Sequence, residues 1–149
     1  METLDRQVEE RVWRRVRGEE ADPRPEQGLL ALIAHEWADA AAYLQLSRRL
    51  PGRDSLLLRE MAQQEQAHGA CLKGLYTMLT GQRPTVRSVP VKQENVEAAL
   101  RRCYGREMQS LALYEARCDD PQYGAVFAHL AKQEREHCHK LLEILGRLK

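Results

Sequence analysis

The chain has 149 residues, and its 23 lysines and arginines almost balance its 22 aspartates and glutamates. This length allows one domain with a substantial core, and the balanced charge argues against a nucleic-acid-binding protein, which normally carries a basic excess. No apolar run reaches the roughly 18 to 20 residues that span a bilayer, and the first residues lack a signal-peptide core, so we expect no membrane association.

The cysteines indicate a reducing compartment. All of them stand inside helical patterns, and none are spaced as Cys-x-x-Cys. This arrangement predicts reduced thiols in a cytoplasmic protein, and it excludes a zinc ribbon within these residues. The four are Cys71, Cys103, Cys118 and Cys138.

The first helical pattern is short and amphipathic. It covers 3–17 and ends at Gly18, so we treat 1–20 as a separate N-terminal segment. A helix of about 15 residues is marginal alone in water, so this segment must dock on its own domain, a second subunit or a partner. After a linker, Pro25 suits the first turn of the next helix, and the main domain is expected to cover 26–148.

Four longer helices are expected in the main domain, at 26–50, 54–80, 93–118 and 121–147. Pro51-Gly52 separates the first pair, and Asp119-Asp120-Pro121 separates the second pair. Breaks this short join neighbours into antiparallel hairpins, whereas the connection after Gly81 contains two prolines and is long enough to cross a bundle. The sequence therefore predicts an all-α four-helix bundle with one crossover.

The chain contains an internal repeat. MAQQEQAHGACL at 61–72 and LAKQEREHCHKL at 130–141 share the pattern [Met/Leu]-Ala-x-Gln-Glu-x-x-His-x-x-x-Leu. In the helices that precede them, a glutamate is followed seven residues later by a tyrosine, and these residues are Glu36, Tyr43, Glu107 and Tyr114. The protein is thus predicted to consist of two copies of one helical hairpin.

Each expected helix places ionisable residues on its apolar face, near its midpoint. These residues are Glu36, Glu65, His68, Glu107, Glu134 and His137. Antiparallel packing would bring the four midpoints to one level, where unpaired carboxylates would cost several kcal/mol for each buried charge. We therefore expect one or more multivalent cations to be bound between the helices.

The number and type of these side chains narrow the choice of metal. Glu and His three residues apart lie on one helix face, so both can reach the same ion. Six ligands are too many for one tetrahedral zinc, and they suit two ions that share bridging carboxylates, with one histidine for each ion. Mixed oxygen and imidazole ligation favours iron or manganese.

This set of residues resembles the rubrerythrin branch of the ferritin-like di-iron carboxylate proteins, in which two glutamates and two Glu-x-x-His motifs meet inside a four-helix bundle. The resemblance covers about 26–147 and implies a ferritin-like fold. By the resemblance, Glu36 and Glu107 are the single carboxylates, while Glu65 and Glu134 bridge or cap the metals. The sequence contains no Cys-x-x-Cys, so we expect the protein to depart from rubrerythrins by lacking their C-terminal rubredoxin domain.

The same resemblance implies that His68 and His137 are terminal nitrogen ligands of two iron ions, or of manganese. Tyr43 and Tyr114 would be phenols near the metals. From their position alone they are core aromatic residues first, and redox participants second. The implied activity is reduction of hydrogen peroxide, or oxidation of ferrous iron by oxygen, in a homodimer or higher homo-oligomer. Electrons would come from an external donor such as a rubredoxin-like protein.

Two other functions fit the residues. A di-iron oxygenase would act on an organic substrate and would need a pocket lined by the helices at 26–50 and 93–118. An iron-handling module would be cargo of a larger shell, with the N-terminal helix at 3–17 as its docking element. Peroxide turnover distinguishes the favoured oxidoreductase from the oxygenase, and co-purification with a shell protein would support the cargo function.

Several other ionisable residues lie near the candidate ligands in the sequence but are not expected to bind the metal. Asp39 lies one turn after Glu36 and could orient a ligand histidine. His35 and His129 lie off the apolar faces and are expected to be exposed. Glu136 and His139 repeat the three-residue spacing, but they face away from Glu134 and have no counterpart in the first repeat, so we expect a solvated pair.

Overall fold

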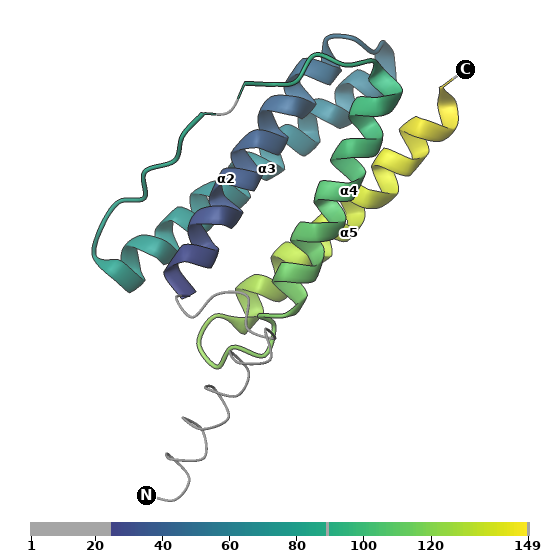
Figure 1. The fold of residues 1–149 in the computed structure, drawn as a ribbon. Helices are drawn as coiled ribbons and strands as arrows, with labels where there is room; N and C mark the ends of the chain where they lie inside the picture. Colours follow the sequence, from purple (N-terminus) through teal and green to yellow (C-terminus); the bar gives the residue numbers. More distant parts are fainter. Residues whose placement is uncertain (1–24, 89, 149) are drawn as a thin grey trace, which may run out of the picture.

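The structure is a computed structural model that describes residues 25–88 and 90–148. The predicted N-terminal helix therefore lies outside the described residues. The described part contains four helices and no strand (Figure 1), and the helices are α2 Pro25–Ser47, α3 Gly52–Thr80, α4 Val96–Glu115 and α5 Gly124–Arg147. The predicted all-α four-helix bundle is confirmed. Within these described ranges, no helix is both long and apolar enough to span a bilayer.

The helices form two antiparallel hairpins, as the short breaks predicted. Figure 1 shows α2 beside α3 and α4 beside α5, each pair joined by a short turn at one end. The connection between Gly81 and Asn95 runs along the outside of α2 and carries the chain to the opposite end of the bundle. The two copies of the repeated motif, at 61–72 and 130–141, lie on α3 and α5, one in each hairpin.

The helix ends differ from the predicted ends by a few residues. The helix α2 ends at Ser47. Residues 48–50, which were predicted to be helical, form a turn before Pro51. The third begins at Val96 because Asn95 caps it, with its side chain accepting the Ala98 N–H at 2.8 Å. The predicted stop of the second helix is confirmed, because Gly81 adopts a φ of 70° and donates its N–H to the Thr77 carbonyl.

The break between α4 and α5 is longer than predicted. Asp120 Oδ1 accepts the backbone N–H of Gln122 at 2.9 Å and of Tyr123 at 2.7 Å. These hydrogen bonds hold residues 121–123 in a turn, so that α5 begins at Gly124 instead of residue 121.

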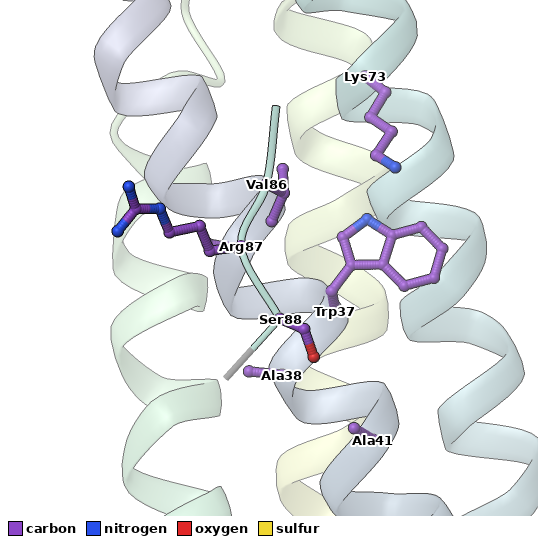
Figure 2. A pocket seen from close by; sticks show the side chains of 8 residues that line it. Trp37, Ala38, Ala41, Lys73, Val86, Arg87 and Ser88 are labelled. Atoms are coloured by element: carbon purple, nitrogen blue, oxygen red, sulfur yellow. The ribbon is translucent and has the colours of Figure 1, made fainter. Parts of the chain in front are cut away.

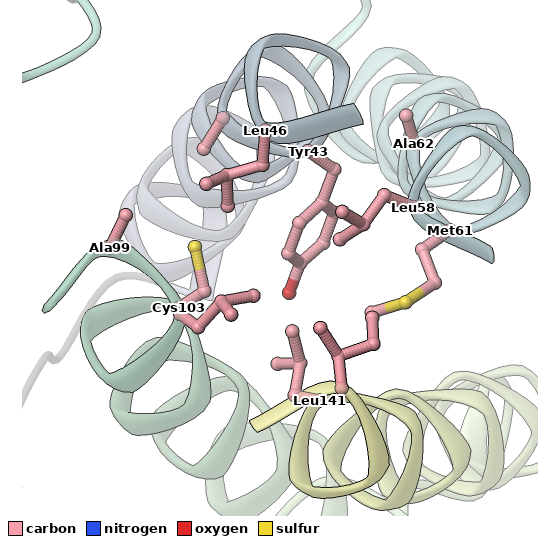
Figure 3. Close-up of a cluster of buried hydrophobic side chains, with 11 residues drawn as sticks. Tyr43, Leu46, Leu58, Met61, Ala62, Ala99, Cys103 and Leu141 are labelled. Atoms are coloured by element: carbon pink, nitrogen blue, oxygen red, sulfur yellow. The ribbon is translucent and has the colours of Figure 1, made fainter. Parts of the chain in front are cut away.

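Two apolar clusters fill the ends of the bundle and leave its middle to the ionisable residues. The cluster around Tyr43 includes Leu58, Leu100, Leu141 and Ile144. In Figure 3 the Tyr43 side chain lies among the side chains of this cluster, with Leu58 and Leu141 labelled, and its hydroxyl points toward the centre of the bundle. The cluster around Tyr114 includes Leu32, Ile33, Leu72, Phe127 and Leu130. The helical spacing also predicts that Leu79 of α3 is buried, but this residue belongs to neither cluster and is 50% exposed.

Candidate metal centre

The structure brings together all six side chains that were expected to bind metal. The two single glutamates come from α2 and α4, and the Glu-x-x-His pairs come from α3 and α5. Every one of the six is at most 2% exposed, and they are Glu36, Glu65, His68, Glu107, Glu134 and His137. They lie between the two apolar clusters, so the surrounding side chains exclude water from them.

The six side chains form two overlapping groups of possible ligands. In each group, one ligand atom from every residue lies within 4.8 Å of the others. The first group is Glu36, Glu65, His68 and Glu134, and the second is Glu65, Glu107, Glu134 and His137. Glu65 and Glu134 belong to both groups, whereas each histidine belongs to only one. This arrangement suits two adjacent ions with two shared carboxylates.

Both imidazoles turn Nδ1 toward the carboxylates. His68 Nδ1 lies 2.9 Å from Glu134 Oε1 and 3.4 Å from Glu36 Oε2. His137 Nδ1 lies 2.5 Å from Glu65 Oε1. Burial alone would lower the pKa of His68, but the hydrogen bond and the negative charge of Glu36 outweigh burial, so this pKa is raised. The carboxylates therefore favour a positive charge at this position, either a proton on His68 Nδ1 or a metal ion in its place.

The opposite imidazole nitrogens contact two glutamines that the sequence analysis did not single out. His137 Nε2 lies 2.5 Å from Gln64 Oε1, and His68 Nε2 contacts Gln133 Oε1. An amide oxygen only accepts, so each Nε2 donates and the Nδ1 lone pair is left for a metal. The signal was present in the sequence, because each glutamine directly precedes the glutamate of its repeat.

The two tyrosines connect α2 and α4 across the site. The Tyr43 hydroxyl donates to Glu107, and the Tyr114 hydroxyl donates to Glu36 Oε1 at 2.5 Å. Burial and the neighbouring carboxylates raise the pKa of both phenols well above the usual range. Each hydroxyl therefore keeps its proton and holds one of the single glutamates in place.

Buried oxygen atoms without hydrogen bonds test whether a metal fits. Five carboxylate oxygens of the site have no hydrogen-bond partner among the described residues, and they are Glu36 Oε2, Glu65 Oε1 and Oε2, Glu107 Oε2 and Glu134 Oε2. Burial raises the pKa of Glu36, which is the penalty expected for a carboxylate removed from water. Divalent cations would satisfy these oxygens and neutralise their charge, so the residues fit a carboxylate-rich metal centre.

Asp39 does not take the role that its sequence position suggested. It is fully buried, but its partner is the Arg106 guanidinium, with Nε 2.9 Å from Oδ1, instead of a ligand histidine. His35 is half-buried, contrary to the expectation of exposure, while His129 is exposed as predicted. Glu136 and His139 are also exposed and belong to neither ligand group, as expected for a solvated pair.

Comparison with known proteins identifies the family. The Rubrerythrin family model matches residues 29–145, which include all six candidate ligands. The chain belongs to the rubrerythrin family. A solved structure described as a ferritin-like, diiron-carboxylate protein from Bacillus anthracis str. Ames has a TM-score of 0.66 and 21% identity, and the match covers 80% of this chain and 94% of that chain. No curated protein matches the chain.

Membership of the rubrerythrin family confirms the resemblance expected from the repeated motif, and the structural match supports the ferritin-like fold. Rubrerythrin-family diiron proteins are generally oxidoreductases that react with an oxidant and an electron donor. The buried Glu/His cluster agrees with a metal site of this class.

Proposed function

We propose that this rubrerythrin-family protein is a non-haem di-iron oxidoreductase that reduces hydrogen peroxide with electrons from an external donor. The observation that carries the proposal is the sharing of Glu65 and Glu134 between two ligand groups, each of which has its own histidine and its own single glutamate. This geometry suits two metal ions side by side. Iron and manganese both accept oxygen and imidazole ligands.

Two adjacent ferrous ions would supply the two electrons that, with two protons, convert hydrogen peroxide to two molecules of water. The protein residues hold the ligands and exclude bulk water. Tyr43 and Tyr114 fix the two single glutamates by hydrogen bonds, and Gln64 and Gln133 fix the two imidazoles. Ligands held in this way need little rearrangement during the reaction.

The enclosure of the site favours a small reactant. A cavity of about 350 Å³ lies on the outer side of α2, between that helix, α3 and the crossover (Figure 2). Trp37, Lys73 and Val86 line this cavity, and none of the six candidate ligands reaches it. An organic substrate in this cavity would therefore be separated from the candidate ligands by α2. A smaller cavity of about 150 Å³ does lie between α2, α4 and the crossover, where an oxygenase would need its pocket, but none of the six candidate ligands lines it either. Hydrogen peroxide and oxygen are small enough to enter the closed site, which favours an oxidoreductase over an oxygenase of organic substrates.

Metal analysis followed by stopped-flow mixing tests the proposal. Protein purified without oxygen should bind about two iron ions per chain, and Glu134→Gln should lose at least one. The matched control is Glu136→Gln, a change to the exposed glutamate two residues away on the same helix, which should leave the iron content unchanged. If the unmodified protein binds no transition metal after reconstitution, the proposal is wrong.

The reaction itself is tested with the reduced protein. Hydrogen peroxide should oxidise the site faster than oxygen does, and sustained consumption of peroxide should begin only when a reductant such as a reduced rubredoxin is added. If oxygen oxidises the site faster than hydrogen peroxide does, peroxide reduction is contradicted, and oxidation of ferrous iron becomes the proposed function of the same site.

A further inference from the structure

A second cavity lies close to the site, on the side where the crossover passes over α2 and α4. It has a volume of about 150 Å³, and its lining includes Ala38 of α2, Pro90 and Lys92 of the crossover, and Arg102 and Arg106 of α4. None of the candidate metal ligands lines this cavity. Arg106 directly precedes the candidate ligand Glu107 on α4.

Arg106 connects this cavity to the interior of the bundle. Its side chain is 26% exposed, while its Nε lies 2.9 Å from Oδ1 of the fully buried Asp39. Asp39 is on the same face of α2 as Glu36 and Tyr43, between them in the sequence. Burial, followed by the negative charge of Glu107, raises the pKa of Asp39, which the Arg106 guanidinium partly offsets. The Asp39–Arg106 ion pair is therefore located between the cavity and the candidate ligands.

The two hairpins of the internal repeat differ at this ion pair, which has no counterpart at the equivalent positions. The offset that relates Glu36 to Glu107 relates Asp39 to Ser110 and Arg106 to His35. Ser110 is fully buried, but it has no charge and no hydrogen-bond partner among the described residues. The ion pair is therefore a feature of one half of the site, the half beside the smaller cavity.

We propose that the cavity beneath the crossover is the entrance to the metal centre and that Arg106 and Asp39 close it. Movement of the long Arg106 side chain away from Asp39 opens the route, and its return seals the site from water. Arg102 of the lining is paired with Glu94, and Arg106 is paired with Asp39, so their charges are largely balanced by carboxylates. Such an entrance suits a small neutral molecule such as hydrogen peroxide. The inference rests on the proposed metal centre.

The entrance can be narrowed without changing either member of the ion pair. Ala38 and Ala41 are both half-buried residues of α2 that line the larger cavity, but only Ala38 also lines the smaller one. Ala38→Phe should therefore obstruct the entrance, and Ala41→Phe is the matched control. The probe is azide, a small anion that binds open metal positions and changes their optical spectrum, so that binding is measured without turnover.

Ala38→Phe is expected to slow azide association and azide dissociation by the same factor, about tenfold, with the dissociation constant unchanged. Oxidation by hydrogen peroxide should slow by a similar factor. Ala41→Phe should leave all three rates unchanged. The inference is overturned if the two variants behave alike, or if Ala38→Phe changes only one of the two azide rates and therefore changes the dissociation constant. Failure of the unmodified protein to bind metal would instead contradict the proposed function.

A variant that widens the entrance provides the opposite test. Asp39→Asn with Arg106→Ala removes both charges together, which avoids leaving a buried carboxylate unpaired. This double variant should react with the bulky tert-butyl hydroperoxide faster than the unmodified protein does. Lys92→Ala removes one positive charge from the same cavity without contacting Asp39, and it should retain the discrimination against the bulky peroxide. Equal discrimination in the double variant would contradict the role of the ion pair.

Discussion

Gln64 and Gln133 each orient a histidine that belongs to the other hairpin. Replacing Gln64 by Leu should leave His137 free to rotate and should weaken metal binding by about 10- to 100-fold, the usual effect of losing a hydrogen bond to a ligand histidine. Metal titration of the metal-free protein measures this change. The control is Gln63→Leu, because Gln63 is exposed and contacts neither histidine; equal losses in both variants would contradict the role of Gln64.

Tyr114 holds Glu36 by a buried hydrogen bond, so Tyr114→Phe should destabilise the metal-free protein by about 1.5 to 3 kcal/mol while keeping the shape of the side chain. Urea unfolding gives the free energy. Tyr104→Phe is a control on the same helix, since the Tyr104 hydroxyl makes no hydrogen bond within the described part of the chain. A loss no larger than that of the control would mean that the Tyr114 hydrogen bond contributes little.

At the scale of single helices, α4 depends on one polar cap. Asn95→Ala should lower the free energy of unfolding by about 1 kcal/mol, because the Ala98 N–H loses its acceptor. The midpoint of urea unfolding should fall with an unchanged slope. Gln93→Ala, an exposed change two residues earlier, should leave the midpoint where it was. An unchanged midpoint in Asn95→Ala would show that water replaces the cap.

The helices could be predicted from the sequence because apolar spacing, prolines and glycines act locally. Their ends were less predictable, since Asn95 and Asp120 decide between helix and turn through hydrogen bonds that several neighbouring residues could also make. Leu79 fits the apolar face of α3, but it lies beyond the part of the helix that the other helices cover. Such differences arise where tertiary packing, rather than periodicity, determines burial.

The candidate ligands were predictable for a different reason: the motif occurs twice, and each copy places Glu and His on an apolar face. Their convergence is observed, whereas their role as metal ligands stays a prediction. The Asp39–Arg106 pair could not be derived, because its two residues lie on different hairpins and are not repeated. The contact between each histidine and the glutamine of the other hairpin likewise required the packed structure.

For the molecule as a whole, bound metal should raise the stability of the fold. A ligand that binds only the folded state at one hundred times its dissociation constant adds about 2.7 kcal/mol. The melting temperature should therefore rise clearly on addition of ferrous or manganous ion. Glu136→Gln should show the same rise, and Glu134→Gln a smaller one. An identical response from both variants would place the stabilising metal elsewhere.

The shared carboxylates also have a consequence for assembly. Each ligand group takes residues from both hairpins, so neither hairpin holds a complete set alone. Two identical hairpins would complete each other equally well, and a chain with half this length can in principle build the same centre as a symmetric pair. Such a pair must have two equal sides. Joining the hairpins through the crossover makes their association intramolecular and lets one side change without the other. The ion pair of Asp39 and Arg106, opposite an uncharged Ser110, is a difference that only a joined chain can encode.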